Sequence, residues 1–173
     1  MSPATGLVER LTLLAAPWHD AYAGSGVLPT AVLFAHFGAL LVGGGLALAA
    51  DRATLRAAAR TADDRARQLV ALGETHRLVV GALAVLFASG GLLFLADVET
   101  FATSRVFWAK GALVALLLAN GLAMTRTERA LHAADRADAG ATDALWRRLR
   151  RGAMLSVALW LSTVLAGTVL TNA

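Results

Sequence analysis

The sequence contains no cysteine. This absence excludes disulfide bonds, thiolate metal sites and thiol catalysis. The chain also lacks the residue patterns of a nucleophile elbow, a phosphate-binding loop, a dinucleotide-binding turn, a zinc metalloprotease helix and a conventional zinc site. Without any of these patterns, we do not expect the protein to act as an enzyme by itself.

Two patterns related to export and to membranes are missing as well. The first residues do not combine a basic region, an apolar run and a small-residue cleavage site, so we predict no removable signal peptide. No stretch shows the alternation of apolar and polar residues, about ten residues long, that is typical of a membrane barrel strand. Because every backbone polar group must be satisfied internally in lipid, any segment that spans a bilayer here is expected to be a helix.

Long apolar runs dominate what is present. Apolar residues make up 57% of the 173-residue chain, which places it in the membrane class. Four runs are each about 18 to 22 residues long, close to the ~20 residues that a helix needs to cross a bilayer. These predicted spans are residues 28–49, 78–96, 106–125 and 153–170. The sequence therefore predicts an all-α fold, an antiparallel bundle of four transmembrane helices within residues 27–173.

Residues 1–26 precede the first span and have a different pattern. They carry an apolar stripe at helical spacing: Leu7, Leu11, Leu14 and Trp18. We predict an amphipathic helix that lies on the outer membrane surface and ends in a turn before the first span. Pro17 is expected to interrupt this helix.

The basic residues predict the orientation in the membrane. Of the sixteen Lys and Arg residues, most lie in the two long connections between helices: Arg52, Arg56, Arg60, Arg65, Arg67, Arg77, Arg126, Arg129, Arg136, Arg147, Arg148, Arg150 and Arg151. By the positive-inside rule, both long loops are predicted to be cytoplasmic, with the N-terminus and the C-terminus outside. These arginines are interleaved with acidic residues and lie close to helix ends, so we predict no nucleic-acid binding.

Residues 50–75, between the first two spans, are rich in alanine and arginine. This composition favours helix, so the first helix is expected to continue into the cytoplasm. Gly73 is the predicted break before the second span.

His36 is the first polar side chain that has to be explained in the first span. On the lipid side it would lack a partner, so we expect it to face other helices. Ala39 and Gly43 share its helical face, and small residues of this kind allow helices to approach closely. Three interpretations are open: a hydrogen bond between helices, a haem or metal ligand, and a proton relay or substrate contact.

Lys110 is expected at a depth similar to that of His36, near the outer end of the third span. Its ammonium either reaches back to the membrane interface or pairs with Asp97, Glu99 or an anionic ligand. Trp108 is either an interface anchor or a stacking residue of the same site.

Asn120, deeper in the third span, is expected to hydrogen-bond across helices and is also a candidate cofactor contact. His76 is predicted at the cytoplasmic mouth of the second span, most of a membrane thickness from His36. The two histidines should therefore not bind the same iron. His76 and His132 can meet on the cytoplasmic side.

Short motifs give the chain a family resemblance. They are His36 followed by Gly43-Gly44, Phe107-Trp108-Ala109-Lys110 at the start of a later helix, and Asn120 with Arg126 near its inner end. In these motifs the chain resembles the bacterial copper-resistance D family and related small polytopic membrane proteins, a group that includes candidate haem binders. The resemblance implies a multi-pass protein of the bacterial inner membrane.

Three functional hypotheses remain open. The first is a non-catalytic subunit of a redox-linked membrane complex that binds haem b or a quinone. In it, His36 is the single histidine and metal ligand, and Lys110 faces a propionate or a quinone carbonyl. The second is a structural assembly subunit without a cofactor, bound to other membrane subunits or to a second copy. The third is a small copper or anion transport protein. The third is disfavoured, because four short helices leave little room for alternating access and the methionines do not cluster with a histidine. Of the other two, we favour the first.

Overall fold

The computed structural model describes residues 3–134 and 139–170. Within these ranges the chain forms helices and no strand: α1 (Pro3–Gly24), α2 (Leu28–Ala57), α3 (Ala62–Ala96), α4 (Val98–Thr103), α5 (Arg105–Ala133) and α6 (Ala139–Leu170). Arg136, one of the basic residues used for the orientation, lies outside the described residues.

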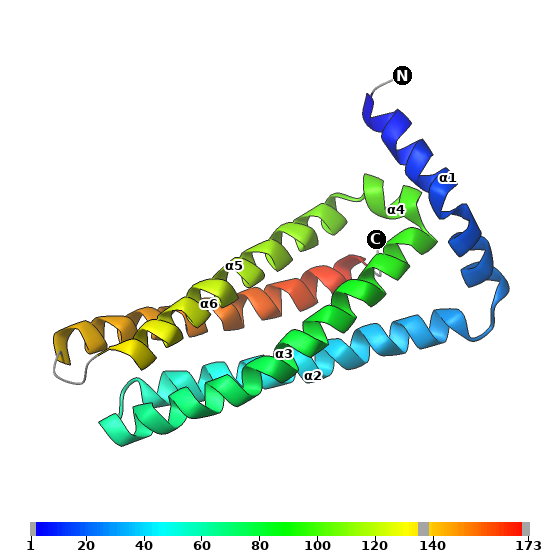
Figure 1. Cartoon of the computed structure of the whole chain (residues 1–173). Helices are drawn as coiled ribbons and strands as arrows, with labels where there is room; N and C mark the ends of the chain where they lie inside the picture. Colours follow the sequence, from blue (N-terminus) through cyan, green and yellow to red (C-terminus); the bar gives the residue numbers. More distant parts are fainter. Residues whose placement is uncertain (1–2, 135–138, 171–173) are drawn as a thin grey trace.

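The long helices pair as two antiparallel hairpins. α3 packs along α2, α6 packs along α5, and α2 contacts α6 and so joins the hairpins. In Figure 1 α2 and α5 end, and α3 and α6 begin, at one end of the molecule, and α1 and α4 lie at the other. The predicted all-α, antiparallel four-helix bundle is confirmed.

Four of the helices, α2, α3, α5 and α6, are long and apolar enough to cross a membrane. Their outward surfaces carry large apolar side chains, among which Phe34 is 79% and Leu41 is 78% exposed. In water such exposure would cost about 25 cal/mol per Å² of apolar surface, whereas lipid solvates it. The chain is therefore a multi-pass membrane protein.

Two adjacent glycines let α2 approach both of its neighbours. A Cβ added to Gly43 would lie 2.8 Å from the Cβ of Ala82 on α3, and one added to Gly44 would lie 3.4 Å from the ring of Trp160 on α6. Each glycine thus allows close packing against a different helix. The expectation that small residues on this face of the first span permit close helix contacts is confirmed.

All four long helices extend beyond their predicted spans at the end where α2 and α5 end and α3 and α6 begin. We call this part the head, and it comprises residues 50–77, 126–134 and 139–152. A buried apolar cluster holds it together: Leu72, Leu131, Trp146 and Leu149. The continuation of the first helix past residue 49 is confirmed.

Arg65 connects three parts of the head. Its guanidinium forms an ion pair with Asp143 at 2.7 Å, donates to the carbonyl of Ala58 at 2.8 Å and lies 5.6 Å from the centre of the Trp146 ring. The head is therefore held by a cation–π contact and polar bonds in addition to apolar packing.

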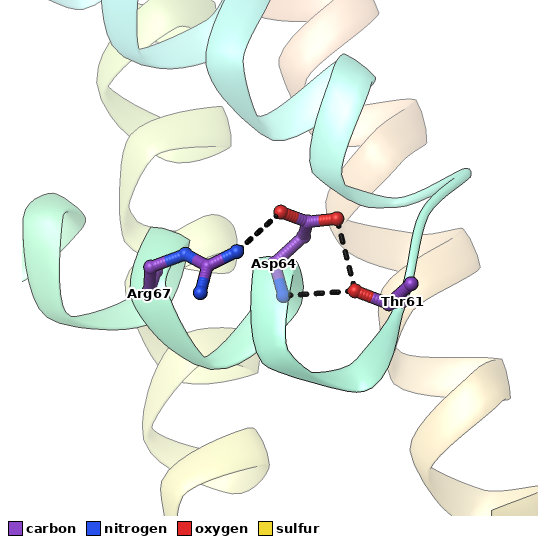
Figure 2. Close-up of polar contacts among 3 residues, drawn as sticks. All are labelled: Thr61, Asp64 and Arg67. Carbon is purple, nitrogen blue, oxygen red and sulfur yellow. Dashed lines mark hydrogen bonds and ion pairs between the residues drawn. The ribbon is translucent and has the colours of Figure 1, made fainter.

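The prediction of a helix break at Gly73 is wrong, because α3 runs through it. The break lies at residues 58–61, and Thr61 caps the start of α3. The Thr61 hydroxyl accepts from the backbone N–H of Asp64 at 3.3 Å and donates to its carboxylate at 2.9 Å (Figure 2). The other carboxylate oxygen of Asp64 accepts from Arg67 at 2.7 Å.

The amphipathic segment forms one continuous helix, α1, that docks on the end of α3 and on α4. Trp18 donates from Nε1 to the carbonyl of Leu92 at 2.9 Å, and Nδ1 of His19 lies 2.6 Å from the carbonyl of Ala96. The prediction that Pro17 interrupts the helix is wrong. A proline removes one backbone hydrogen bond, and the contacts of the two residues after it hold the next turn in place.

Candidate functional site

His36 faces α3, as predicted from its place in the first span. Its Nδ1 lies 3.0 Å from the hydroxyl oxygen of Ser89. That hydroxyl also lies 2.7 Å from the carbonyl of Val85. Because it has one proton, it accepts from Nδ1–H of His36 when that proton is donated to Val85. In the neutral imidazole, Nε2 then carries the lone pair that can bind a metal or accept a proton.

Gly90 of α3 has no side chain and leaves room for the His36 ring. A Cβ added to Gly90 would lie 3.4 Å from Cε1 of the ring. The ring also packs edge-on against Phe37, with 6.1 Å between the ring centres. The imidazole is therefore held by a hydrogen bond on one nitrogen and by close packing on α3.

Lys110 of α5 reaches the same level of the bundle. Its Nζ lies against Gly167 of α6, 3.5 Å from where a Cβ on that glycine would be. Its charge lies close enough to act on His36. Within residues 3–134 and 139–170, Lys110 forms no ion pair with Asp97 or Glu99.

Thr163 lies one helical turn before Gly167 on α6 and shares its face. It is 6% exposed, and its hydroxyl has no hydrogen-bond partner in the part of the chain that the structure describes. We call the following four residues the α1-side polar layer: His36, Ser89, Lys110 and Thr163. The side chains of this layer carry a ring nitrogen, an ammonium and hydroxyl groups.

Trp108 lies on the outside of this layer. It is 61% exposed, and its Nε1–H donates to the carbonyl of Ala102 at 2.9 Å. Its neighbour Phe107 stacks on Phe94 with 5.3 Å between ring centres and so connects α5 to α3. These contacts are those of an interface anchor.

Asn120 forms the predicted hydrogen bond across helices. Its amide donates to the carbonyl of Gly152 on α6 at 3.0 Å. Ten residues separate it from Lys110, which is roughly 15 Å along a helix. The structure therefore does not bring Asn120 into the α1-side polar layer.

An apolar layer lies between the α1-side polar layer and the head. Its buried core consists of Leu117, Leu159 and Trp160, surrounded by partly buried apolar residues of α2, α3 and α5. Side chains of the two polar regions are thereby separated in this conformation.

A second polar group lies at the base of the head. Asp51 is buried, and Ser156 of α6 donates a hydrogen bond to its carboxylate. Glu128 of α5 lies close enough for its charge to act on Asp51. The charges of His76 and His132 in turn act on Glu128.

The sequence analysis did not single out this second group. Asp51 resembled one more acid among the arginines that follow the first span. The spacing along the helix could have predicted its burial. Asp51 follows Gly44 by seven residues and so lies on the same, buried face of the helix.

Compared with models of known protein families, with curated proteins and with solved structures, the chain matches none.

Proposed function

We propose that this protein is a non-catalytic subunit of a redox-linked membrane complex that binds haem b or a quinone at His36. The observation that carries the proposal is the hydrogen bond from Nδ1 of His36 to Ser89, which leaves the lone pair on Nε2. Metal-binding histidines commonly donate their other ring N–H to a protein acceptor in this way. The resemblance to the copper-resistance D family supports the same proposal.

The position of the Lys110 ammonium inside the bundle supports the proposal that the ligand carries an oxygen atom. An ammonium inside a membrane bundle is costly unless an anion or a polar oxygen faces it. A haem propionate or a quinone carbonyl supplies such an oxygen. In the proposal, Nε2 of His36 ligates the haem iron or accepts from a quinol hydroxyl, and Lys110 donates to the oxygen.

Cofactor analysis of the protein purified in mild detergent tests this proposal. We expect haem in the absorption spectrum, or quinone in the solvent extract, in a fixed ratio to the chain. His36→Ala is expected to lose the cofactor, whereas His132→Ala, an exposed histidine of the head, is the matched control that keeps it. Lys110→Gln is expected to reduce the amount of cofactor that stays bound during purification.

Two outcomes would overturn the cofactor site. Protein that folds fully and carries neither haem nor quinone contradicts the proposal, and stable partners that co-purify with it would then favour an assembly subunit. Uptake of copper or an anion into liposomes, abolished by the His36→Ala and Lys110→Gln changes together, would favour a transport protein.

We also propose that the head is cytoplasmic, with both chain ends outside the inner membrane of a bacterium. The many arginines of the head support this orientation. Because the chain has no cysteine, single introduced cysteines report position without interference. We expect a membrane-impermeant maleimide to label Gly26→Cys in intact cells and to label Arg60→Cys only after the membrane is opened; the reverse pattern contradicts the proposed orientation.

A further inference from the structure

Asp51 is a buried carboxylate at the point where the predicted first span meets the head. It is 4% exposed. Its Oδ2 has no hydrogen-bond partner among the described residues. An ionised carboxylate here has lost its water without a hydrogen bond to Oδ2 in its place, which favours uptake of a positive charge.

The groups around Asp51 do not supply that positive charge. Glu128 of α5 adds a charge of the same sign, and α6 contributes the neutral hydroxyl of Ser156. His76 of α3 and His132 of α5 act on Glu128. Within the described ranges, neither carboxylate forms an ion pair with a lysine or an arginine.

A proton fits this group better than a metal ion does. Hard metal ions such as Ca²⁺ and Mg²⁺ take about six or more oxygen ligands. The described residues contain no group of three or more His, Asp or Glu side chains that could hold a metal ion. A proton needs one oxygen, and a second negative charge nearby favours protonation of a poorly hydrated carboxylate.

We propose that Asp51 is a proton-binding site at the base of the head and that the charge of Glu128 favours its protonated form. Oδ2 of Asp51 takes up one proton and becomes part of a carboxylic acid. The charge of the side chain falls from one negative to zero, and no other bond forms or breaks.

The apolar layer closes the site on its other side. The ring of Trp160 lies over Gly44, two helical turns from Asp51, and belongs to the buried core of that layer. Protons therefore reach Asp51 from the head and not from His36. This inference does not depend on a cofactor in the α1-side polar layer.

Infrared difference spectroscopy of the purified protein during a pH titration tests the proposal. As the pH falls, the C=O stretching band of a protonated carboxyl is expected to appear with a midpoint well above the ~3.9 of a solvated aspartate. Asp51→Asn is expected to remove this band. Glu128→Gln removes the neighbouring negative charge, so the band should remain and its midpoint should move to lower pH. Asp63→Asn, an exposed acid of α3, is the matched control and should change nothing.

Three results would overturn the proposal. The first is a band that persists with the same midpoint in Asp51→Asn, and the second is a band that appears only at the pH of a solvated carboxyl. The third is a midpoint that moves when Na⁺ is exchanged for K⁺ at constant ionic strength, which would place a metal cation in the site. If Asp51→Asn does not fold, an unchanged midpoint in Glu128→Gln contradicts the proposed effect of Glu128.

Discussion

Gly43 of α2 lies so close to Ala82 of α3 that a Cβ on the glycine would be 2.8 Å from the Cβ of the alanine. Gly43→Ala therefore forces α2 and α3 apart, and we expect it to lower the free energy of unfolding by about 1–3 kcal/mol. Denaturant unfolding in detergent micelles, followed by circular dichroism, measures the change.

Gly45→Ala is the control for this substitution. It makes the same chemical change two residues further along the same helix, where nothing lies within 4 Å of the added Cβ. Alanine is the better helix former by about 1 kcal/mol, so this variant should be as stable as the wild type or slightly more stable. Equal losses in both variants would show that the α2–α3 contact is not as close as described.

Ser89→Ala removes the acceptor for Nδ1–H of His36. We expect the imidazole to lose its single tautomer, because nothing then favours the hydrogen on Nδ1. Inter-helix hydrogen bonds of this kind contribute about 0.6 kcal/mol in membrane proteins, so the protein should still fold. The ¹⁵N chemical shifts of the histidine ring report the tautomer, and Ser162→Ala, an exposed serine of α6, is the control. A wild-type ring with its hydrogen on Nε2 would contradict the assignment.

The sequence could predict the features that lipid imposes. A histidine inside an apolar span lacks a hydrogen-bond partner on the lipid side, so the inward orientation of His36 followed from its position alone. The same reasoning located the spans and the close approach at Gly43, because spacing along a helix determines which residues share a face.

Other features depend on contacts that only the folded chain provides. Gly73 was expected to break the helix, but the neighbouring Leu72 is buried in the core of the head, and this packing outweighs the poor helix propensity of glycine. The burial of Asp51 likewise requires that α3 and α6 extend beyond their predicted spans and pack against α2. Composition indicates that such extensions are helical but not that they pack together.

Thr61→Ala removes the N-cap of α3 and is expected to cost about 1 kcal/mol of stability (Figure 2). Thr75→Ala is the matched control on the same helix, since that hydroxyl bonds only to the carbonyl of Ala71 one turn earlier. Thermal unfolding of the two variants separates the cap from the general effect of threonine replacement. Equal stability of the two variants would contradict a role for the cap.

The same cap predicts a dependence on pH. Hydrogen bonds from Arg67 and then from Thr61 hold the pKa of Asp64, in the head and outside the spans, below its usual value. A lowered pKa in the folded state stabilises the protein above the unfolded pKa of ~3.9, and this contribution is lost as the pH falls through the folded value. In Asp64→Asn, the free energy of unfolding should therefore fall less steeply as the pH is lowered through the acid range. An unchanged pH dependence in this variant would show that the carboxylate is not held by these bonds.

Asn120→Leu separates a structural role from a cofactor contact. The amide donates to the carbonyl of Gly152 on α6, and this bond joins α5 to α6 far from Lys110 along the helix. Its loss should lower the unfolding free energy by about 0.6 kcal/mol, the average for such bonds in membranes. Because Asn120 lies outside the α1-side polar layer, the amount of bound haem or quinone should not change. A variant that keeps wild-type stability and loses the cofactor would reverse this assignment and place Asn120 in the binding site, since only direct contact with the ligand would then explain the effect.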